Sequence, residues 1–204
     1  MTKFIYVVFA FLVACSDGAP KQSALPAGSK VLILGDSLSY GTGAKQGEDY
    51  PTLLARATGW DIVNAGVPGD TTAGGLERLP ALLAQHQPAL LIVELGGNDF
   101  LHQLPSHQTE GNLKAIVAQA AGTKVLLLAI PEFSPLMAAV GNLSDHPMYE
   151  RVADETHTPL IAEVFSEVLS ERALKADQVH PNVNGYAQVA TKLEDSLREL
   201  GYLR

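Results

Sequence analysis

The stretch VLILGDSLS at residues 31–39 determines how this chain is expected to fold. Its first four residues form an apolar run of the kind that is buried on both faces at the centre of a parallel sheet. Gly35 and Asp36 then turn the chain, so that Ser37 stands at the carboxyl end of the predicted strand. Ligands of open α/β sheets bind at that end of the strands. We therefore expect Ser37 to lie at a functional site.

Similar apolar runs recur along the chain and alternate with helical patterns. Further strands are predicted at 61–64, 89–95, 124–130 and 159–162, and helices at 51–59, 73–86, 109–121, 147–157, 163–172 and 184–200. Thr109 is a candidate cap for the third of these helices, and Pro80 is expected to kink or split the second. This alternation predicts βαβ units, and hence an α/β fold in three layers, with a five-stranded parallel sheet between helices on both faces. Right-handed crossovers bring the carboxyl ends of all strands to one edge.

Composition restricts the class of protein. The 204 residues suit one domain, and the apolar content of 47% favours a compact core over disorder. A formal charge of −8 argues against a nucleic-acid partner, which needs a basic face. A single cysteine excludes an intrachain disulfide and any Cys/His zinc spacing. Nothing in the sequence demands a metal or a cofactor.

The first residues have the pattern of a leader that is removed. Lys3 precedes an apolar run at 4–14, which is too short to span a bilayer and is typical of a signal peptide. The run ends in LVAC, which resembles a bacterial lipobox with Cys15 as the lipidated residue, and Ser16 favours sorting to the outer membrane. An ordinary secretory signal with an incidental cysteine is the alternative. We predict a signal peptide at 1–14.

The rest of the predicted organisation follows from that leader. Residues 15–29 are small, polar and contain Gly and Pro, which is typical of a flexible tether. The folded domain is then expected at 30–204. The protein would be anchored by its lipid in the bacterial cell envelope, facing the periplasm, and would act as a monomer.

A second stretch near the end of the chain complements the first. DQVHP at 177–181 contains an aspartate three residues before a histidine. A serine hydroxyl is a poor nucleophile until an imidazole accepts its proton, and a carboxylate can orient that imidazole. Ser37, His180 and Asp177 together would therefore form a triad for acyl transfer. Taken singly, each has another interpretation: the serine as a helix cap, and the histidine as a core residue bonded to the aspartate.

Acyl transfer also needs donors for the oxyanion that forms on the carbonyl. Gly66 and Asn98 follow the second and third predicted strands, and so should lie near Ser37. The expected donors are the backbone N–H groups of Ser37 and Gly66 and the side-chain amide of Asn98. As alternatives, Gly66 could serve only as a hinge and Asn98 only as a turn residue.

Four segments taken together resemble the blocks of the SGNH (GDSL) hydrolase family: GDSLS at 35–39, the loop after residue 65, GGND at 96–99 and DQVHP at 177–181. The resemblance runs from about residue 30 to the end. It implies a flavodoxin-like sheet, Ser37 as nucleophile, and Gly66 and Asn98 as oxyanion donors. Within the family, the chain is most similar to the bacterial periplasmic thioesterase/protease/lysophospholipase branch and its arylesterase relatives. The serine lies in GDS and not in the GxSxG turn of α/β-hydrolases.

The expected substrate is an acyl ester or thioester of short to medium chain length, and lysophospholipids are candidates. Residues 131–149 contribute Phe133, Leu136, Met137, Val140, Leu143, Met148 and Tyr149, which would either line an acyl pocket or pack over the sheet. Two other functions remain open. One is a carbohydrate or peptidoglycan O-acetylesterase of the envelope, and the other is a catalytically silent binding lipoprotein.

Three further acidic residues lie close to these segments. Glu94 lies in an apolar strand and must either face an edge of the sheet or find a partner, because a buried carboxylate without a partner is costly. We expect Asp99 to fix the loop beside Asn98, and Asp70 to organise hydrogen bonds in the loop after residue 65.

Overall fold

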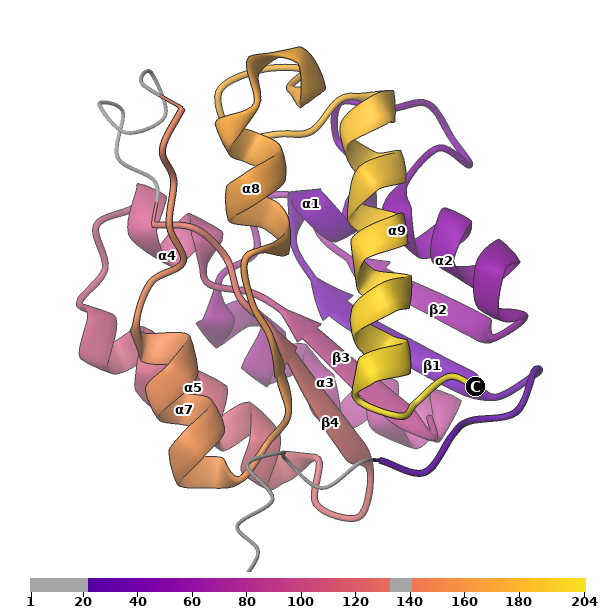
Figure 1. Cartoon of the computed structure of the whole chain (residues 1–204). Helices are drawn as coiled ribbons and strands as arrows, with labels where there is room; N and C mark the ends of the chain where they lie inside the picture. Colours follow the sequence, from indigo (N-terminus) through magenta and orange to yellow (C-terminus); the bar gives the residue numbers. More distant parts are fainter. Residues whose placement is uncertain (1–21, 133–140) are drawn as a thin grey trace, which may run out of the picture.

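The computed structural model of the protein describes residues 22–132 and 141–204 (Figure 1). Five parallel strands form one sheet in the order β2-β1-β3-β4-β5, as expected from the sequence and from the flavodoxin-like resemblance. The strands are β1 (Lys30–Gly35), β2 (Asp61–Gly66), β3 (Leu90–Glu94), β4 (Lys124–Leu128) and β5 (Leu160–Ile161). The α/β prediction is confirmed.

Helices cover both faces of the sheet, as Figure 1 shows. The longer helices are α2 (Tyr50–Thr58), α3 (Thr72–His86), α5 (Ser106–Gln119), α7 (Met148–Thr156), α8 (Val164–Ser170) and α9 (Val183–Glu199). One layer contains α2, α8 and α9, and the other contains α3, α5 and α7. Two short helices, α1 (Ser37–Tyr40) and α4 (Gly97–Leu101), follow the carboxyl ends of β1 and β3, and a 3₁₀ turn covers Arg172–Leu174.

The centre of the sheet is a dry core. The side chains from Val31 to Leu34 of β1 have no exposed surface, and those from Leu90 to Val93 of β3 are at most 1% exposed. Burying one such aliphatic side chain contributes about 1.5–3 kcal/mol. These two strands are therefore fixed in register by the burial of both of their faces.

The register brings three chain segments level at one edge. Gly35, the last residue of β1, pairs with Gly66 of β2 on one side and with Glu94 of β3 on the other. The turns that follow these residues therefore leave the sheet side by side. This edge is where the residues predicted to act in catalysis should meet.

The described chain begins earlier than the predicted domain boundary. Within the segment 22–29, the N–H of Gln22 donates to Leu200 O and that of Leu25 to Tyr202 O. Leu25 also packs against the core. The second half of the predicted tether is therefore attached to the C-terminal residues. The signal peptide and Cys15 lie outside the described residues.

The start predicted for one helix was wrong, and Pro80 does not split another. Helix α5 begins at Ser106 after Pro105, and not at Thr109. Thr109 lies inside the helix, where its hydroxyl donates to the carboxylate of Asp99 at 3.2 Å, so tertiary contact and not capping explains this threonine. Helix α3 is continuous through Pro80. Within residues 22–132 and 141–204, no helix combines the length and the apolar character needed to cross a membrane.

Candidate active site

Ser37 stands in a turn that its own neighbours hold in place. It is the first residue of α1, directly after the carboxyl end of β1. Asp36 caps this helix, since its carboxylate accepts the N–H of Leu38 at 2.9 Å. The helix ends at Gly41, whose φ of 92° reverses the chain. The hydroxyl of Ser37 is thereby displayed at the sheet edge.

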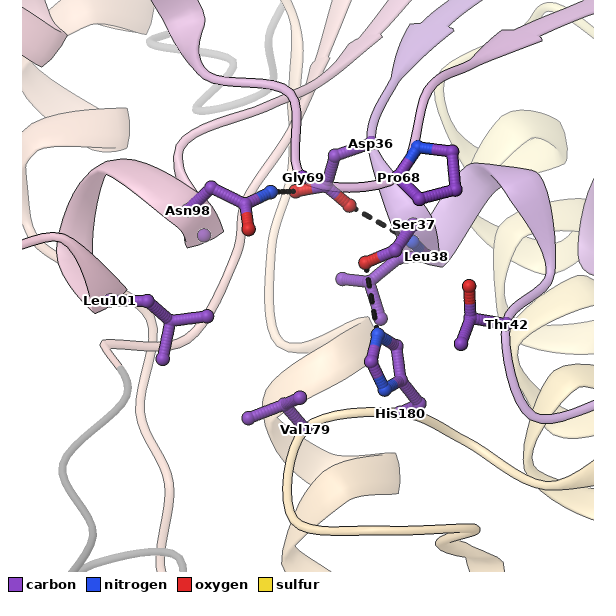
Figure 2. Close-up of a pocket in the computed structure, with 11 residues that line it drawn as sticks. Asp36, Ser37, Leu38, Thr42, Pro68, Gly69, Asn98, Leu101, Val179 and His180 are labelled. Atoms are coloured by element: carbon purple, nitrogen blue, oxygen red, sulfur yellow. Dashed lines mark hydrogen bonds between the residues drawn. The ribbon is translucent and has the colours of Figure 1, made fainter.

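The structure brings Ser37 and His180 together across 143 residues of sequence. His180 Nε2 lies 2.9 Å from Ser37 Oγ, and His180 Nδ1 lies 2.7 Å from Asp177 Oδ2. Figure 2 draws the first of these two hydrogen bonds. With Nδ1–H donated to the carboxylate, Nε2 is free to accept the hydroxyl proton. This arrangement can activate a serine.

The loop that carries His180 is folded around Asp177. The other carboxylate oxygen of Asp177 accepts the N–H groups of Val179 and His180, at 2.8 and 2.9 Å. Burial acts to raise the pKa of Asp177, but the hydrogen bonds from the His180 ring and from these two N–H groups outweigh it and lower the pKa below its usual value. Asp177 therefore remains an ionised acceptor for the imidazole.

Gly66 does not supply a donor to this site, contrary to the sequence-based expectation. Its N–H donates to the side chain of Asn64 at 2.9 Å. A Cβ on Gly66 would meet Tyr40 N at 2.4 Å and Asp36 O at 2.8 Å. Gly66 is thus needed because the backbone around Ser37 packs directly on β2.

A second glycine of the same loop, Gly69, faces the site. It lines the cavity beside Ser37, and its φ is +80°. The N–H of Asp70 donates to Val67 O at 3.0 Å, which closes a type II turn with Pro68 and Gly69 at its centre. The sequence VPGD carries the signature of that turn, and could have identified the glycine. Within the described residues, the N–H groups of Gly69 and Ser37 have no hydrogen-bond acceptor, so both are available to a ligand.

Asn98 lies at the site, but its amide is already engaged. It starts from the first turn of α4 and is 9% exposed. Its Nδ2 donates to Asp36 Oδ2 at 3.0 Å and to Asp70 O at 2.8 Å. An oxyanion would have to share one of these N–H groups or displace its acceptor. The remaining acidic residue of this loop, Asp99, accepts Thr72 N–H at 2.9 Å and the Thr72 hydroxyl at 2.5 Å, which is the loop-fixing role expected for it.

Two buried carboxyl groups lie beneath the nucleophile turn. Glu94 is fully buried, and its Oε2 accepts the hydroxyl and N–H of Ser39 at 2.5 and 3.0 Å, while its Oε1 has no partner among the described residues. Burial and the charge of Asp36 raise the pKa of Glu94 well above its usual value. Burial likewise raises the pKa of Asp36 to about 7. The partner that the sequence required for Glu94 is therefore Ser39, whose hydroxyl also bonds Tyr50 at 2.6 Å.

A cavity of about 230 Å³ opens onto Ser37 and His180 (Figure 2). Its walls include four apolar side chains, namely Leu38, Pro68, Leu101 and Val179. Three of the residues predicted as an alternative acyl lining, Leu143, Met148 and Tyr149, are buried and do not face this cavity. They pack over the sheet. Phe133, Leu136, Met137 and Val140 lie outside the described residues.

No cluster of three or more His, Cys, Asp or Glu side chains within residues 22–132 and 141–204 could hold a metal ion. The groups that meet around the cavity are a hydroxyl, an imidazole, a carboxylate and free N–H donors. Such a set suits the addition of a nucleophile to a carbonyl group.

Comparisons with known proteins agree with this chemistry. The model of the GDSL-like Lipase/Acylhydrolase family matches residues 33–188. The thioesterase 1/protease 1/lysophospholipase L1 of Escherichia coli K12 is 37% identical over 205 residues, covering 96% of this chain and 93% of the relative. The esterase TesA of Pseudomonas aeruginosa is 35% identical over 185 residues, covering 85% and 90%. A crystal structure of TesA superposes with a TM-score of 0.74 at 33% identity, covering 84% of this chain and 99% of that one.

Proposed function

This chain belongs to the GDSL-like lipase/acylhydrolase family and is a carboxylic ester hydrolase, and we propose that it cleaves esters and thioesters of short to medium acyl chains through an acyl-enzyme on Ser37. The observation that carries this proposal is the continuous hydrogen-bonded series from Ser37 Oγ through His180 to Asp177. Each link has the length of a normal or charge-assisted hydrogen bond.

The reaction would begin at the hydroxyl of Ser37. Its oxygen attacks the carbonyl carbon while His180 Nε2 accepts the proton, and Asp177 stabilises the imidazolium that forms. When the tetrahedral intermediate collapses, His180 returns the proton to the departing alcohol or thiol. A water molecule, activated by the same imidazole, then attacks the acyl-enzyme and releases the acid.

The negative charge on the tetrahedral intermediate would be received by the N–H groups of Ser37 and Gly69. Both line the cavity, and neither donates to another described residue. Preorganised donors of this kind stabilise the charge without reorganising during the reaction. Asn98 would contribute as a third donor by sharing the N–H that it gives to Asp36 or to Asp70.

The cavity supports an acyl substrate. Leu101 is 46% exposed although it is apolar, and Figure 2 shows it projecting towards the space in front of Ser37. Apolar surface left open beside a nucleophile favours an alkyl chain over a sugar. Lysophospholipids, which the Escherichia coli relative is named for, fit this description.

The proposal is tested by replacing the nucleophile. Ser37→Ala should lower the turnover of p-nitrophenyl butyrate by about 10⁶-fold and abolish labelling by a fluorophosphonate. Ser106→Ala, which alters an exposed serine at the start of α5, is the matched control and should behave like the wild type. Labelling that persists in Ser37→Ala would contradict the proposal, and a wild-type protein that is never labelled would favour the silent binding protein.

A series of p-nitrophenyl esters from C2 to C16 tests the substrate class. We expect activity to peak at short to medium chains, because the apolar walls of the cavity bind additional methylene groups until the space is filled. Activity confined to the acetate would favour an O-acetylesterase of the cell envelope.

We propose in addition that Cys15 carries a lipid which anchors the enzyme in the envelope, with the hydrolase domain facing the periplasm. The support is the apolar run at 4–14 followed by LVAC. Cys15→Ser or treatment with globomycin should leave the precursor unprocessed or release the protein from the membrane fraction. Unchanged processing and fractionation would favour the ordinary secretory signal.

A further inference from the structure

Arg78 is a cation next to the active site that the proposed reaction does not use. It lies on α3, and its side chain is 24% exposed. Its three nitrogens donate to three different segments: Nη2 to Gly35 O at 2.9 Å, Nη1 to Ala65 O at 2.6 Å and Nε to Asp70 Oδ2 at 2.7 Å. A planar guanidinium holds its donors in fixed directions, so these three bonds fix the relative positions of the three acceptors.

The acceptors of Arg78 flank the two N–H groups that are free at the site. Gly35 lies two residues before Ser37 and ends β1, and Asp70 directly follows Gly69. Ala65 lies near the end of β2, from which the turn with Gly69 departs. One side chain therefore joins the segment that displays Ser37 N–H to the segment that displays Gly69 N–H.

Asp70 extends this connection to the third donor. Its backbone carbonyl accepts Asn98 Nδ2 at 2.8 Å, and its own N–H closes the turn that contains Gly69. One carboxylate oxygen accepts Thr71 N–H at 3.0 Å, and the other binds Arg78. Displacement of Asp70 would thus alter Gly69 and Asn98 together.

We propose that Arg78, held by Asp70, is a positioning residue that sets the spacing of the oxyanion donors at Ser37, Gly69 and Asn98. The inference rests on the proposed acyl-enzyme reaction. Within residues 22–132 and 141–204, Arg78 is absent from the cavity wall, and its side chain donates to groups that lie behind the donors. It acts through them and not on the substrate.

An arginine is required here by geometry and not only by charge. A lysine at this position would supply a positive charge, but its single ammonium group cannot reach three acceptors that are arranged around a planar fork. The Lys variant therefore separates the two contributions. If the spacing of the donors matters, retaining the charge will restore only part of the activity.

The test compares Arg78→Met, Arg78→Lys and the control Arg151→Met. Arg151 also bonds a carboxylate, that of Glu110 at 2.8 Å, but it lies half-exposed on α7, and within the described residues its side chain makes no hydrogen bond to the Ser37, Gly69 or His180 loops. Arg78→Met should lower kcat by about 10²-fold, the effect typical of losing an oxyanion donor, and Arg78→Lys by about tenfold, with KM changed less than about threefold. Arg151→Met should match the wild type.

A second readout separates positioning from general loss of structure. A trifluoromethyl ketone accepts the Ser37 oxygen at its carbonyl carbon and forms an oxyanion, with the serine proton passing to His180. The affinity of Arg78→Met for this inhibitor should fall by about the same factor as kcat, while its affinity for the matching methyl ketone stays unchanged, because only the former loads the oxyanion donors.

Three outcomes would overturn the proposal. They are a kcat within about threefold of the wild type in Arg78→Met, full activity in Arg78→Lys, and an equal loss of affinity for both ketones. In each case, ester hydrolysis and fluorophosphonate labelling by the wild-type protein and the Ser37→Ala variant show separately whether the acyl-enzyme reaction takes place. A wild-type protein that neither hydrolyses esters nor reacts with a fluorophosphonate would overturn both proposals at once.

Discussion

Two aspartates lie on either side of the Ser37–His180 pair, and the fold shifts their pKa values in opposite directions. The side chain of Asp177 is 54% exposed, and hydrogen bonds from its own loop lower its pKa despite the burial that it has. Asp36 is 2% exposed, and burial raises its pKa to about 7 although Leu38 and Asn98 donate to it. The charges of neighbouring carboxylates contribute to this rise.

The opposite pKa shifts of Asp177 and Asp36 reflect two different structural roles at this site. The loop at 177–180 is built from contacts within four residues, so it can sit at the surface and still keep a charged, well-directed carboxylate. The region beneath Ser37 is built from Asp36 and from groups on α1, β3 and α4, and it holds carboxyl groups in a place where their ionised form is costly. One side of the site activates the nucleophile, and the other fixes the shape of its surroundings.

Among the variants that test this contrast between the two aspartates, Asp177→Asn should have the largest effect. An amide at this position no longer accepts the Nδ1–H of His180 in the required tautomer, so kcat should fall by about 10⁴-fold. Steady-state kinetics with p-nitrophenyl butyrate measures the change. Asp154→Asn, an exposed aspartate on α7, serves as control. A loss below about tenfold would remove Asp177 from the proposed mechanism.

Asp36→Asn should instead change how stability depends on pH. The pKa of Asp36 is about 7 in the folded protein against 3.8 as its ordinary value, so the folded state binds more protons between these two values. The free energy of unfolding therefore decreases as pH rises through that window, by about 4 kcal/mol in total. In Asp36→Asn this part of the decrease should vanish.

Urea denaturation between pH 4 and pH 8.5 provides the measurement for Asp36. The slopes with pH are compared, and not the absolute values, because the amide also changes the hydrogen bonds to Leu38 and Asn98 at every pH. If the free energy of unfolding varied with pH in the same way in both proteins, the pKa of Asp36 would not be raised in the folded state. The contrast with Asp177 would then disappear.

Gly66→Ala tests the packing on the buried side. The new Cβ would lie 2.4 Å from Tyr40 N, which belongs to the backbone and cannot move alone. We expect the free energy of unfolding to fall by about 1–3 kcal/mol, together with loss of activity as the turn at Ser37 is displaced. A variant of normal stability and activity would show that α1 does not depend on close approach to β2.

Gly69→Ala should have the smallest effect on stability. Nothing lies within 4 Å of the added Cβ, and only the φ of +80° opposes it, which costs about 1–2 kcal/mol. Gly122→Ala is a matched control, since it also has a positive φ, of +95°, and open space. Both should lose similar stability, but only Gly69→Ala should lose activity. The activity should fall because an alanine strained at this φ turns the Gly69 N–H away from the oxyanion; equal activities would show that the turn keeps its shape with an alanine.

The correction from Gly66 to Gly69 illustrates where sequence reasoning failed. Both glycines follow the second strand, and position relative to a strand end does not distinguish them. The turn signature VPGD does distinguish them, because the third position of a type II turn has a positive φ, which strongly favours a glycine. A glycine is needed at position 66 for a different reason, because the backbone of α1 packs directly against it. That contact can be recognised only once β1 and β2 are paired.

Thr109 and the segment 22–29 were misjudged for a related reason. A threonine before a helical pattern is a normal cap, but here Asp99, ten residues away, supplies a stronger partner for its hydroxyl. Small residues with Gly and Pro predict a tether, yet Leu25 finds an apolar surface and a backbone acceptor near the C-terminus. In both cases a contact distant in sequence overrides a local preference.

The sequence by itself determined the parallel α/β fold and the residues Ser37, Asp177 and His180, because apolar runs and short-range spacing are local properties of a chain. Only the tertiary structure decided which glycine faces the cavity, that Asn98 is bound to Asp36 and Asp70, and that Arg78 joins the strand ends. Those facts depend on the directions of hydrogen bonds between segments from different strands. Such directions are fixed by the register of the sheet, which no single segment encodes.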